Sequence, residues 1–380
     1  MIAKTPPMGF NTWNTFGPDI NDRVIRETAD AMVEQGLLDA GYEYLVIDDC
    51  WSERERDPQT KKIVADRKKF PDGMKAVADY VHSKGLKFGM YTCAGMRTCA
   101  GYPGSYKHEF LDAETFAEIG VDFLKYDFCC RSYYSNGPML YRKMGIALKA
   151  TGREILFSMC NWGSDDVWKW ARAYGAHMYR STGDICDNFK SFTDIAMSQK
   201  DLFCHSGPYC FNDMDMLTVG MYGKGNVAAG GCSSVEYKSQ FALWCLFGTP
   251  LMLGCDIRSM NDETLELVTN KELIRINQDP EARGIITLNA NPWNSDYKAF
   301  MRHLSNNESI IGLFNFGDSG TRKPVFLMDD FGIDPNCGYG LKLTNLFTGE
   351  EIGPISDYFE MPEDTQPHDC VLYRARFVKI

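Results

Sequence analysis

The chain has 380 residues, of which 44% are hydrophobic and 24% are charged. This length exceeds that of an ordinary small domain, so we expect a large domain with a smaller partner. The formal net charge is −11. That sign is opposite to the one a duplex-binding surface needs, which argues against a nucleic acid as partner. No apolar stretch reaches the roughly 18 residues of a membrane-spanning helix, so no membrane partner is expected.

The 14 cysteines are scattered through apolar segments, as at Cys245 and Cys255, which predicts reduced, buried thiols. No CxxC pair and no glycine-rich phosphate fingerprint is present, so we predict neither a metal nor a cofactor. Residues 1–7 lack a basic segment followed by an apolar one. We therefore expect a cytoplasmic, bacterial protein, or a secreted one whose signal has been removed.

Apolar runs alternate with helical patterns from the start of the chain to about residue 280. Eight strands are predicted, over residues 8–10, 44–47, 86–90, 121–126, 155–157 and 178–179, within 203–213, and over 249–254. A helical face follows the second of them, at Met74, Val77 and Val81. Strands that are buried on both faces give such continuous apolar runs. The pattern predicts an α/β fold, a (β/α)8 barrel over residues 1–282.

The pattern changes after Pro280. Short strands are predicted over residues 285–288, 298–304, 309–314, 323–327, 341–346 and 370–377. Turn residues separate them, for example at 306–307 and 348–349. We expect a C-terminal antiparallel β-sandwich domain over residues 283–380.

Acidic residues follow several of the predicted barrel strands. They are Asp48, Asp49, Asp127, Asp184, Asp213 and Asp215. Active sites of barrel enzymes lie at these strand ends, and glycoside hydrolysis needs two carboxyl groups across the scissile bond. Aromatic residues near the same ends can supply the walls of a sugar pocket: Trp13, Trp51, Tyr91 and Trp162. Each aspartate taken alone is more often a helix N-cap or a turn former.

Seven segments, in chain order, resemble the strand ends of one enzyme family. They are residues 5–13 (TPPMGFNTW), 47–51 (IDDCW), 98–105 (TCAGYPGS), 125–129 (KYDFC), 180–185 (RSTGDI), 211–217 (FNDMDML) and 276–280 (INQDP). The family is glycoside hydrolase family 27, which contains α-galactosidases and α-N-acetylgalactosaminidases. The resemblance covers essentially the whole chain, and the ordered set of motifs is specific although each one alone is modest.

The resemblance implies a retaining, exo-acting α-galactosidase that forms a covalent glycosyl-aspartate and takes α-galactosides as its carbohydrate substrate. Asp127 would be the nucleophile, and Asp184 would be the general acid and then the base. Asp48 and Asp49 would hold the 4-OH and 6-OH of galactose. The other substrate-binding residues that it implies are Trp13, Tyr91, Cys99, Lys125, Asn161, Trp162, Arg180 and Asp215.

These roles agree with the positions of the charged residues. Lys125 lies two residues before Asp127 on one predicted strand, so both side chains point to the same face. The ammonium group favours the ionised carboxylate that a nucleophile needs. Asp184 must begin protonated, so its pKa is expected to lie above the usual range for Asp.

Three positions depart from the family's pattern. Asn161 stands where many members carry a Glu that contacts the 2-OH, and Asn keeps the hydrogen bond without the charge. Phe128 replaces a small or polar residue, and we expect it either to shape the leaving-group side or to pack against a loop. Extracellular members pair the cysteines that match Cys99 and Cys129, a disulfide that would be absent or labile in a cytosolic chain.

Several alternatives stay open. Within the same family they are an α-N-acetylgalactosaminidase and a β-L-arabinopyranosidase, although the pair Asp48 and Asp49 favours a hexose with a 6-OH. A catalytically inactive sugar-binding protein is disfavoured because both Asp127 and Asp184 are present. A metal-dependent barrel hydrolase is disfavoured by the near absence of His at strand ends, and a cysteine nucleophile by the lack of a nearby His. A homo-oligomer is left open.

Overall fold

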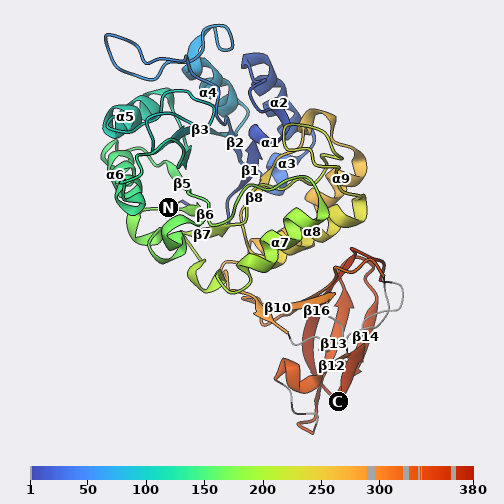
Figure 1. Ribbon diagram of the computed structural model, residues 1–380. Helices are drawn as coiled ribbons and strands as arrows, with labels where there is room; N and C mark the ends of the chain where they lie inside the picture. Colours follow the sequence, from blue (N-terminus) through green and yellow to red (C-terminus); the bar gives the residue numbers. More distant parts are fainter. Residues whose placement is uncertain (1, 289–295, 320–324, 333, 335, 361–364) are drawn as a thin grey trace.

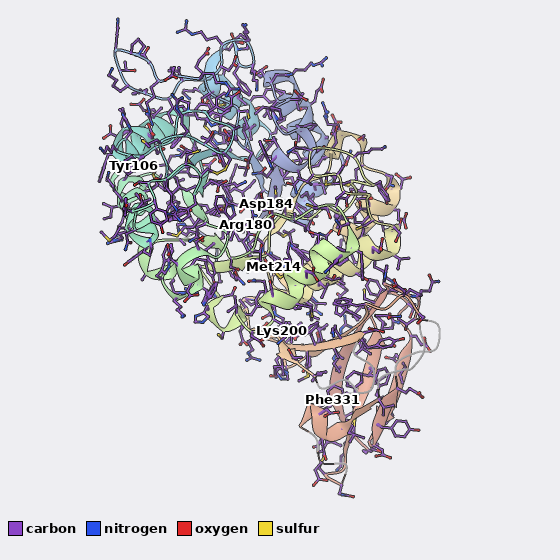
Figure 2. The ribbon with its side chains drawn as sticks, viewed as in Figure 1. Tyr106, Arg180, Asp184, Lys200, Met214 and Phe331 are labelled. Atoms are coloured by element: carbon purple, nitrogen blue, oxygen red, sulfur yellow. A yellow bond between two sulfur atoms is a disulfide. The ribbon has the colours of Figure 1, made fainter. Side chains whose placement is uncertain are left out.

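The computed structural model describes residues 2–288, 296–319, 325–332, 334, 336–360 and 365–380. The N-terminal part is a ring of strands with helices around it, and the C-terminal part is a stack of antiparallel strands beside the ring (Figure 1). The side chains fill the ring and the space between the two parts (Figure 2).

Eight short, parallel strands form the ring. They are β1 Met8–Asn11, β2 Tyr44–Val46, β3 Lys87–Cys93, β4 Phe123–Asp127, β5 Leu156–Cys160, β6 Met178–Arg180, β7 Phe211–Asp213 and β8 Leu251–Leu253. Their order is β7-β6-β5-β4-β3-β2-β1-β8. Leu217, just after β7, forms a parallel bridge with Leu253 and so closes the ring. The predicted (β/α)8 barrel is confirmed.

Helices surround the ring and cover the outer faces of the strands. They are α1 Trp13–Phe16, α2 Asp22–Glu34, α3 Leu37–Ala40, α4 Gly73–Ser83, α5 Glu109–Ile119, α6 Gly137–Ala150, α7 Phe189–Gln199, α8 Ser234–Phe247, α9 Asp262–Val268 and α10 Lys271–Asn277. Single 3-10 turns are η1 Ser164–Lys169, η2 Arg172–Tyr174, η3 Phe203–His205, η4 Ile257–Ser259 and η5 Met328–Phe331. No helix of the described residues is long and apolar enough to cross a membrane.

The predicted apolar face of α4 is present. Met74, Val77 and Val81 are buried, because residues three or four apart share one face of a helix. Gly85 follows the helix with a positive φ of 82°, and the Leu86 N–H donates to the carbonyl of Val81. This left-handed glycine ends the helix and turns the chain into β3.

Strand ends differ from the predicted ones in two places that affect the site. β3 continues to Cys93, so Tyr91 lies within the strand instead of after it. β7 begins only at Phe211, because η3 and a tight turn, in which Gly207 and Cys210 form a bridge, occupy the preceding residues.

The C-terminal part contains a six-stranded antiparallel sheet and a two-stranded one. Their strands are β9 Ile286–Thr287, β10 Tyr297–His303, β11 Ser309–Asn315, β12 Val325–Leu327, β13 Tyr339–Asn345, β14 Glu351–Ile355, β15 Tyr358–Glu360 and β16 Cys370–Lys379. The large sheet has the order β14-β13-β16-β11-β10-β9, and β12 pairs with β15. Side chains of both sheets, among them Leu313, Phe326 and Phe359, share one buried cluster, as expected of a sandwich.

Two of these strands were not predicted from the sequence. β14 and β15 are mostly exposed, so they lack the apolar run by which a buried strand is recognised. For the strand predicted over 323–327, residues 323 and 324 lie outside the described residues.

Arg302 on β10 joins the large sheet to the barrel. Its side chain is fully buried, and its Nε donates to the Arg283 carbonyl at 2.9 Å. Its Nη1 donates to the Ile276 carbonyl in α10 at 2.9 Å and to the Cys245 carbonyl in α8 at 3.3 Å. Burial lowers the pKa of Arg302 to about 10, while carbonyls near the ends of the two helices offer partial negative charge in return.

Candidate active site

One pocket opens at the C-terminal ends of the barrel strands and holds about 510 Å³ of empty space, its open mouth included. Its lining residues are Trp13, Asn14, Asp48, Asp49, Tyr91, Cys99, Lys125, Asp127, Trp162, Arg180, Asp184, Ile185, Asp215, Met216 and Val227. The structure therefore brings together the predicted catalytic and substrate-binding residues except Asn161, whereas the other candidates Trp51, Cys129 and Asp213 do not line this pocket.

Asp127 ends β4 and is almost completely buried. Its Oδ1 accepts a hydrogen bond from the Phe128 N–H at 2.8 Å, and its Oδ2 accepts one from the Tyr91 hydroxyl at 3.2 Å. Burial raises the pKa of Asp127 to about 6, although Lys125, the Phe128 N–H and Arg180 oppose the rise. The expected stabilisation of the carboxylate by Lys125 is thus present, but desolvation outweighs it.

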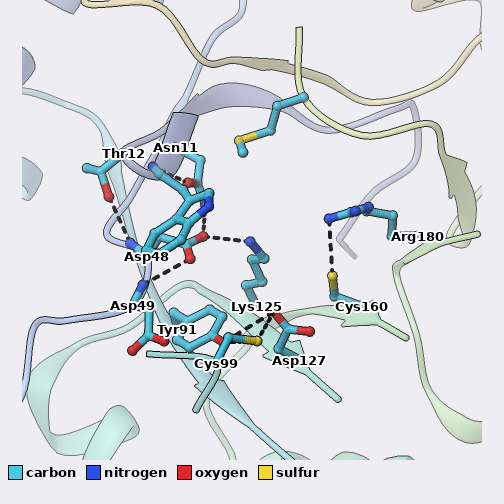
Figure 3. A network of polar contacts seen from close by, with 12 residues as sticks. Asn11, Thr12, Asp48, Asp49, Tyr91, Cys99, Lys125, Asp127, Cys160 and Arg180 are labelled. Atoms are coloured by element: carbon cyan, nitrogen blue, oxygen red, sulfur yellow. Dashed lines mark hydrogen bonds and ion pairs between the residues drawn. The ribbon is translucent and has the colours of Figure 1, made fainter. Parts of the chain in front are cut away.

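Lys125 points to the same face of β4 as Asp127 but forms its ion pair with another carboxylate. Its Nζ lies 2.7 Å from Oδ2 of Asp48, which also accepts from the Asn11 amide at 2.7 Å (Figure 3). The ammonium group lies 5.4 Å from the centre of the Tyr91 ring. Asp48 and the other carboxylates around Lys125 raise its pKa despite burial, so the residue stays charged.

Asp49 is held by backbone groups. Its Oδ1 accepts from the Cys50 N–H at 2.7 Å, and its Oδ2 accepts from the Ala100 N–H at 3.0 Å. Burial raises the pKa of this carboxyl group. Each oxygen keeps a second lone pair, which can accept a hydrogen bond from a ligand hydroxyl.

Arg180 at the end of β6 connects two more carboxylates. Its Nη2 forms an ion pair with Asp184 and lies 3.3 Å from Oδ2 of Asp215. Asp215 has a positive φ of 86°, and its carboxylate accepts from the Ile185 and Met216 N–H groups at 2.8 and 2.7 Å. A strained backbone at a pocket residue is a frequent mark of a functional site.

The environment of Asp184 differs from the expectation. Its side chain is 75% exposed, and its pKa lies below the usual Asp value because the contact with Arg180 outweighs desolvation. The prediction of a raised pKa for Asp184 is wrong for this structure. The prediction assumed that Asp184 is buried. The sequence also does not show that Asp184 contacts Arg180, which lies four residues earlier.

Asn161 does not line the pocket. It is fully buried, and its Nδ2 donates to the Ser164 carbonyl at 2.7 Å, so the side chain turns back into its own loop. Trp162, the next residue, faces the pocket instead and has a positive φ of 56°. Asn161 is therefore not among the residues that line this pocket, and its Oδ1 has no hydrogen-bond partner among the described residues.

Cys99 and Cys129 form a disulfide at the pocket wall. The Cys99 Sγ lies 3.8 Å from Oδ2 of Asp127, and the Tyr91 hydroxyl lies 3.7 Å from the same sulfur. Among the described residues the other cysteines are free. The prediction of buried, reduced thiols thus holds for eight of the free cysteines, whereas Cys130, Cys186, Cys204 and Cys337 are exposed.

Four lining residues were not predicted: Asn14, Ile185, Met216 and Val227. Asn14 lies one position after the motif of residues 5–13, so extending that motif would have found it. Ile185 and Met216 lie inside the motifs of residues 180–185 and 211–217, but neither was assigned a role. Val227 lies in the long segment between β7 and α8, and no local pattern indicates that this segment folds back over the pocket.

Two carboxylic acids, one buried and one exposed, in a barrel pocket with further acids and aromatic walls are characteristic of a glycoside hydrolase. Comparison with known proteins narrows this class. Residues 5–279 match the family model described as alpha galactosidase A. The chain is 46% identical over 319 residues to the α-galactosidase of Cyamopsis tetragonoloba, covering 84% of this chain and 74% of the relative.

Solved structures agree with the sequence comparison. The α-galactosidase I of Mortierella vinacea superposes with a TM-score of 0.89 and 33% identity, covering 98% of this chain and 97% of the other. An α-galactosidase from Saccharomyces cerevisiae, solved with raffinose, gives a TM-score of 0.84 at 26% identity, over 99% and 98% of the two chains. The chain belongs to the alpha galactosidase A family, glycoside hydrolase family 27.

The burial of Asp127 leads to a prediction about stability. Its pKa is about 6 in the folded chain against an ordinary 3.8, so between these values the unfolded chain ionises while the folded chain does not. Folding stability is therefore lost as pH rises through this window, by up to about 3 kcal/mol above pH 6. We expect Asp127→Asn to raise the free energy of unfolding at pH 7 but not near pH 3.5, as measured by chemical denaturation.

Asp184→Asn is the matched control. The pKa of the Asp184 carboxyl group is lowered in the folded chain, so removal of its charge should not stabilise the chain at pH 7. An Asp127→Asn variant that is less stable than the unmodified chain at pH 7 would contradict the assignment of burial as the dominant effect on Asp127.

Proposed function

We propose that this chain removes terminal α-D-galactosyl residues with retention of configuration, with Asp127 as nucleophile and Asp184 as acid and base. One observation carries the assignment of roles: a buried carboxylate, Asp127, and an exposed one, Asp184, line a single pocket at the strand ends. The relatives support the substrate, since they are α-galactosidases and one solved structure contains raffinose.

In the first step the Asp127 carboxylate attacks the anomeric carbon and the bond to the leaving oxygen breaks. Asp184 gives its proton to that oxygen, and a covalent galactosyl-aspartate remains. The hydrogen bond from Phe128 N–H holds Oδ1 of Asp127, so the carboxylate has a fixed direction before the sugar enters. Such prior orientation lowers the barrier, because the reacting groups need no further ordering.

In the second step Asp184 takes a proton from a water molecule, whose oxygen attacks the anomeric carbon from the face that the leaving group vacated. The bond from that carbon to Asp127 breaks, which releases galactose and restores the Asp127 carboxylate. Two inversions give net retention. Asp184 is suited to this exchange because its side chain is exposed to the open side of the pocket. A bound sugar displaces water from around it and disturbs its contact with Arg180, and both changes raise the pKa towards that of a proton donor.

The far end of the pocket would hold the sugar hydroxyls. Asp48 and Asp49 present fixed oxygens with spare lone pairs, and Lys125 adds an ammonium donor. Charge-assisted hydrogen bonds of this kind are stronger than neutral ones. We assign the 4-OH and 6-OH of galactose to this end and the ring faces to Trp13 and Tyr91.

We do not assign the 2-OH to Asn161, because its Nδ2 donates to the Ser164 carbonyl within its own loop. Arg180 is a charged residue of the pocket lining, and we assign it to a ring hydroxyl. The preference for galactose over its 2-acetamido derivative is therefore a question for the substrate panel.

A panel of three 4-nitrophenyl glycosides tests the substrate. We expect the highest kcat/KM for the α-galactoside, since the Asp48–Asp49 end matches a sugar with both a 4-OH and a 6-OH. The comparison substrates are the α-N-acetylgalactosaminide and the β-L-arabinopyranoside. A higher kcat/KM on either of them would overturn the choice of galactose.

The two acids should respond differently to the leaving group. Asp127→Asn removes the nucleophile, so turnover should fall at least about 10³-fold on both 4-nitrophenyl α-galactoside and raffinose. Asp184→Asn should lower raffinose hydrolysis by about 10²–10⁴-fold. It should spare the first step with the nitrophenyl substrate, whose leaving group needs no proton, and give a burst of nitrophenolate in stopped-flow.

Asp166→Asn is the matched control for both variants, because Asp166 is an exposed residue of η1 paired with Lys169. Its kinetics should equal those of the unmodified chain. Equal losses on both substrates without a burst in Asp184→Asn would remove that residue from the role of acid.

A further inference from the structure

The four most exposed large hydrophobic side chains of the described residues lie on two neighbouring loops. Tyr134 is 92% exposed, Tyr133 89%, Met96 62% and Met139 60%. Met96 follows β3, and the other three lie in the loop after β4 and in the first turn of α6. Apolar side chains gathered in this way on a soluble surface mark a place of interaction.

The two loops are joined to each other and to the pocket. The Met96 N–H donates to the Cys130 carbonyl at 3.3 Å, and the disulfide from Cys129 to Cys99 fixes the start of the β4 loop at the pocket wall. Four residues separate Cys129 from Tyr133, a length of chain that spans at most about 14 Å. The tyrosines therefore lie within the length of a short oligosaccharide from the pocket.

Aromatic side chains continue from the pocket towards the loop. Trp162 lines the pocket, and its ring centre lies 6.4 Å from that of Phe128. The Arg131 guanidinium covers Phe128 at 4.2 Å from the ring centre, so Phe128 is buried and Trp162 is the exposed member of the wall. Phe128 thus acts by supporting the wall beside the nucleophile.

Tyr133 and Tyr134 pack edge to face, with ring centres 5.4 Å apart and planes at 88°. Each keeps most of its surface open to solvent, and the described residues leave both hydroxyls without a hydrogen bond. A tyrosine ring offers an apolar face and a polar tip. Sugar rings have the complementary surfaces, namely C–H faces and hydroxyl edges.

We propose that the rim formed by Met96, Tyr133, Tyr134 and Met139 binds the sugar units on the leaving-group side of an oligosaccharide α-galactoside. This inference rests on the proposed function, because a pocket that encloses the terminal galactosyl unit directs the rest of the substrate out through its mouth. Met96 and the two tyrosines lie in the segments that follow β3 and β4, and the same two segments and strands supply Cys99 and Asp127 to the pocket. The preferred substrates are then galactosides of oligosaccharides, and small aryl galactosides do not reach the tyrosines.

The test compares two substrates in matched variants. Replacing both tyrosines by alanine (Tyr133→Ala with Tyr134→Ala) should raise KM for raffinose about five- to tenfold by the loss of ring contacts. The kcat/KM for 4-nitrophenyl α-galactoside should stay within about twofold, because that substrate occupies the pocket alone. The double Tyr→Phe variant keeps the rings and should bind raffinose nearly as the unmodified chain does. Tyr358→Ala, an exposed tyrosine of β15, is the control and should change neither value.

An unchanged ratio of the two kcat/KM values in the double alanine variant would overturn the proposal, as would an equal loss on both substrates. The unmodified chain could also form a dimer that dissociates in the double alanine variant while the kinetics stay unchanged. That result would make the rim a contact between two copies of the chain and would also overturn the proposal. A chain that hydrolyses neither substrate would count against the proposed function instead. The rim is then tested by calorimetric titration with raffinose, whose affinity should fall at least about fivefold in the double alanine variant, and an equal affinity would overturn the inference.

Discussion

The charge state of the pocket depends on how two cationic side chains, Lys125 and Arg180, are paired with its carboxylates. Lys125 is bonded to Asp48 at 2.7 Å, and Arg180 is paired with Asp184 and Asp215. Asp127 has neither cation as a direct partner, and burial leaves its pKa at about 6. The contact with Arg180 lowers the pKa of Asp184 and so stabilises it as an anion, while Asp127 stays a reactive and poorly solvated carboxylate.

This division of charge follows from the register of the parallel strands. Tyr91 on β3 pairs with Lys125 on β4, and Lys125 pairs with Ser158 on β5. Arg180 on β6 lies beside Cys160 and Asp213. Side chains at paired positions of neighbouring parallel strands point to the same face, so the two cations face one interior. A change of register by one residue would turn either of them out of the barrel.

Much of the fold was predictable from the sequence because barrel strands are buried on both faces. Each of the eight predicted runs contains or overlaps a strand, although the seventh, predicted within 203–213, begins only at Phe211. Five of the acidic residues at the strand ends meet in one pocket, namely Asp48, Asp49, Asp127, Asp184 and Asp215. The C-terminal strands β14 and β15 were missed because they are exposed and carry no such run.

The site was predictable in its members and less so in its interactions. A motif gives the order of residues along a strand, so Asp48, Lys125 and Asp127 could be placed together. It does not give the direction of a side chain in a loop, and Asn161 turns away from the pocket for that reason. The protonation of Asp184 was also misjudged, since its pKa depends on a contact with Arg180 that only the folded chain reveals.

The central claim is that the carboxyl groups of Asp127 and Asp184 act in turn on one anomeric carbon. Proton NMR of the first sugar released from an α-galactoside, recorded before mutarotation, tests this claim most directly. Two successive displacements predict that α-galactose forms first and that the β-anomer grows in later. Initial release of β-galactose would show a single displacement by water and would contradict the account.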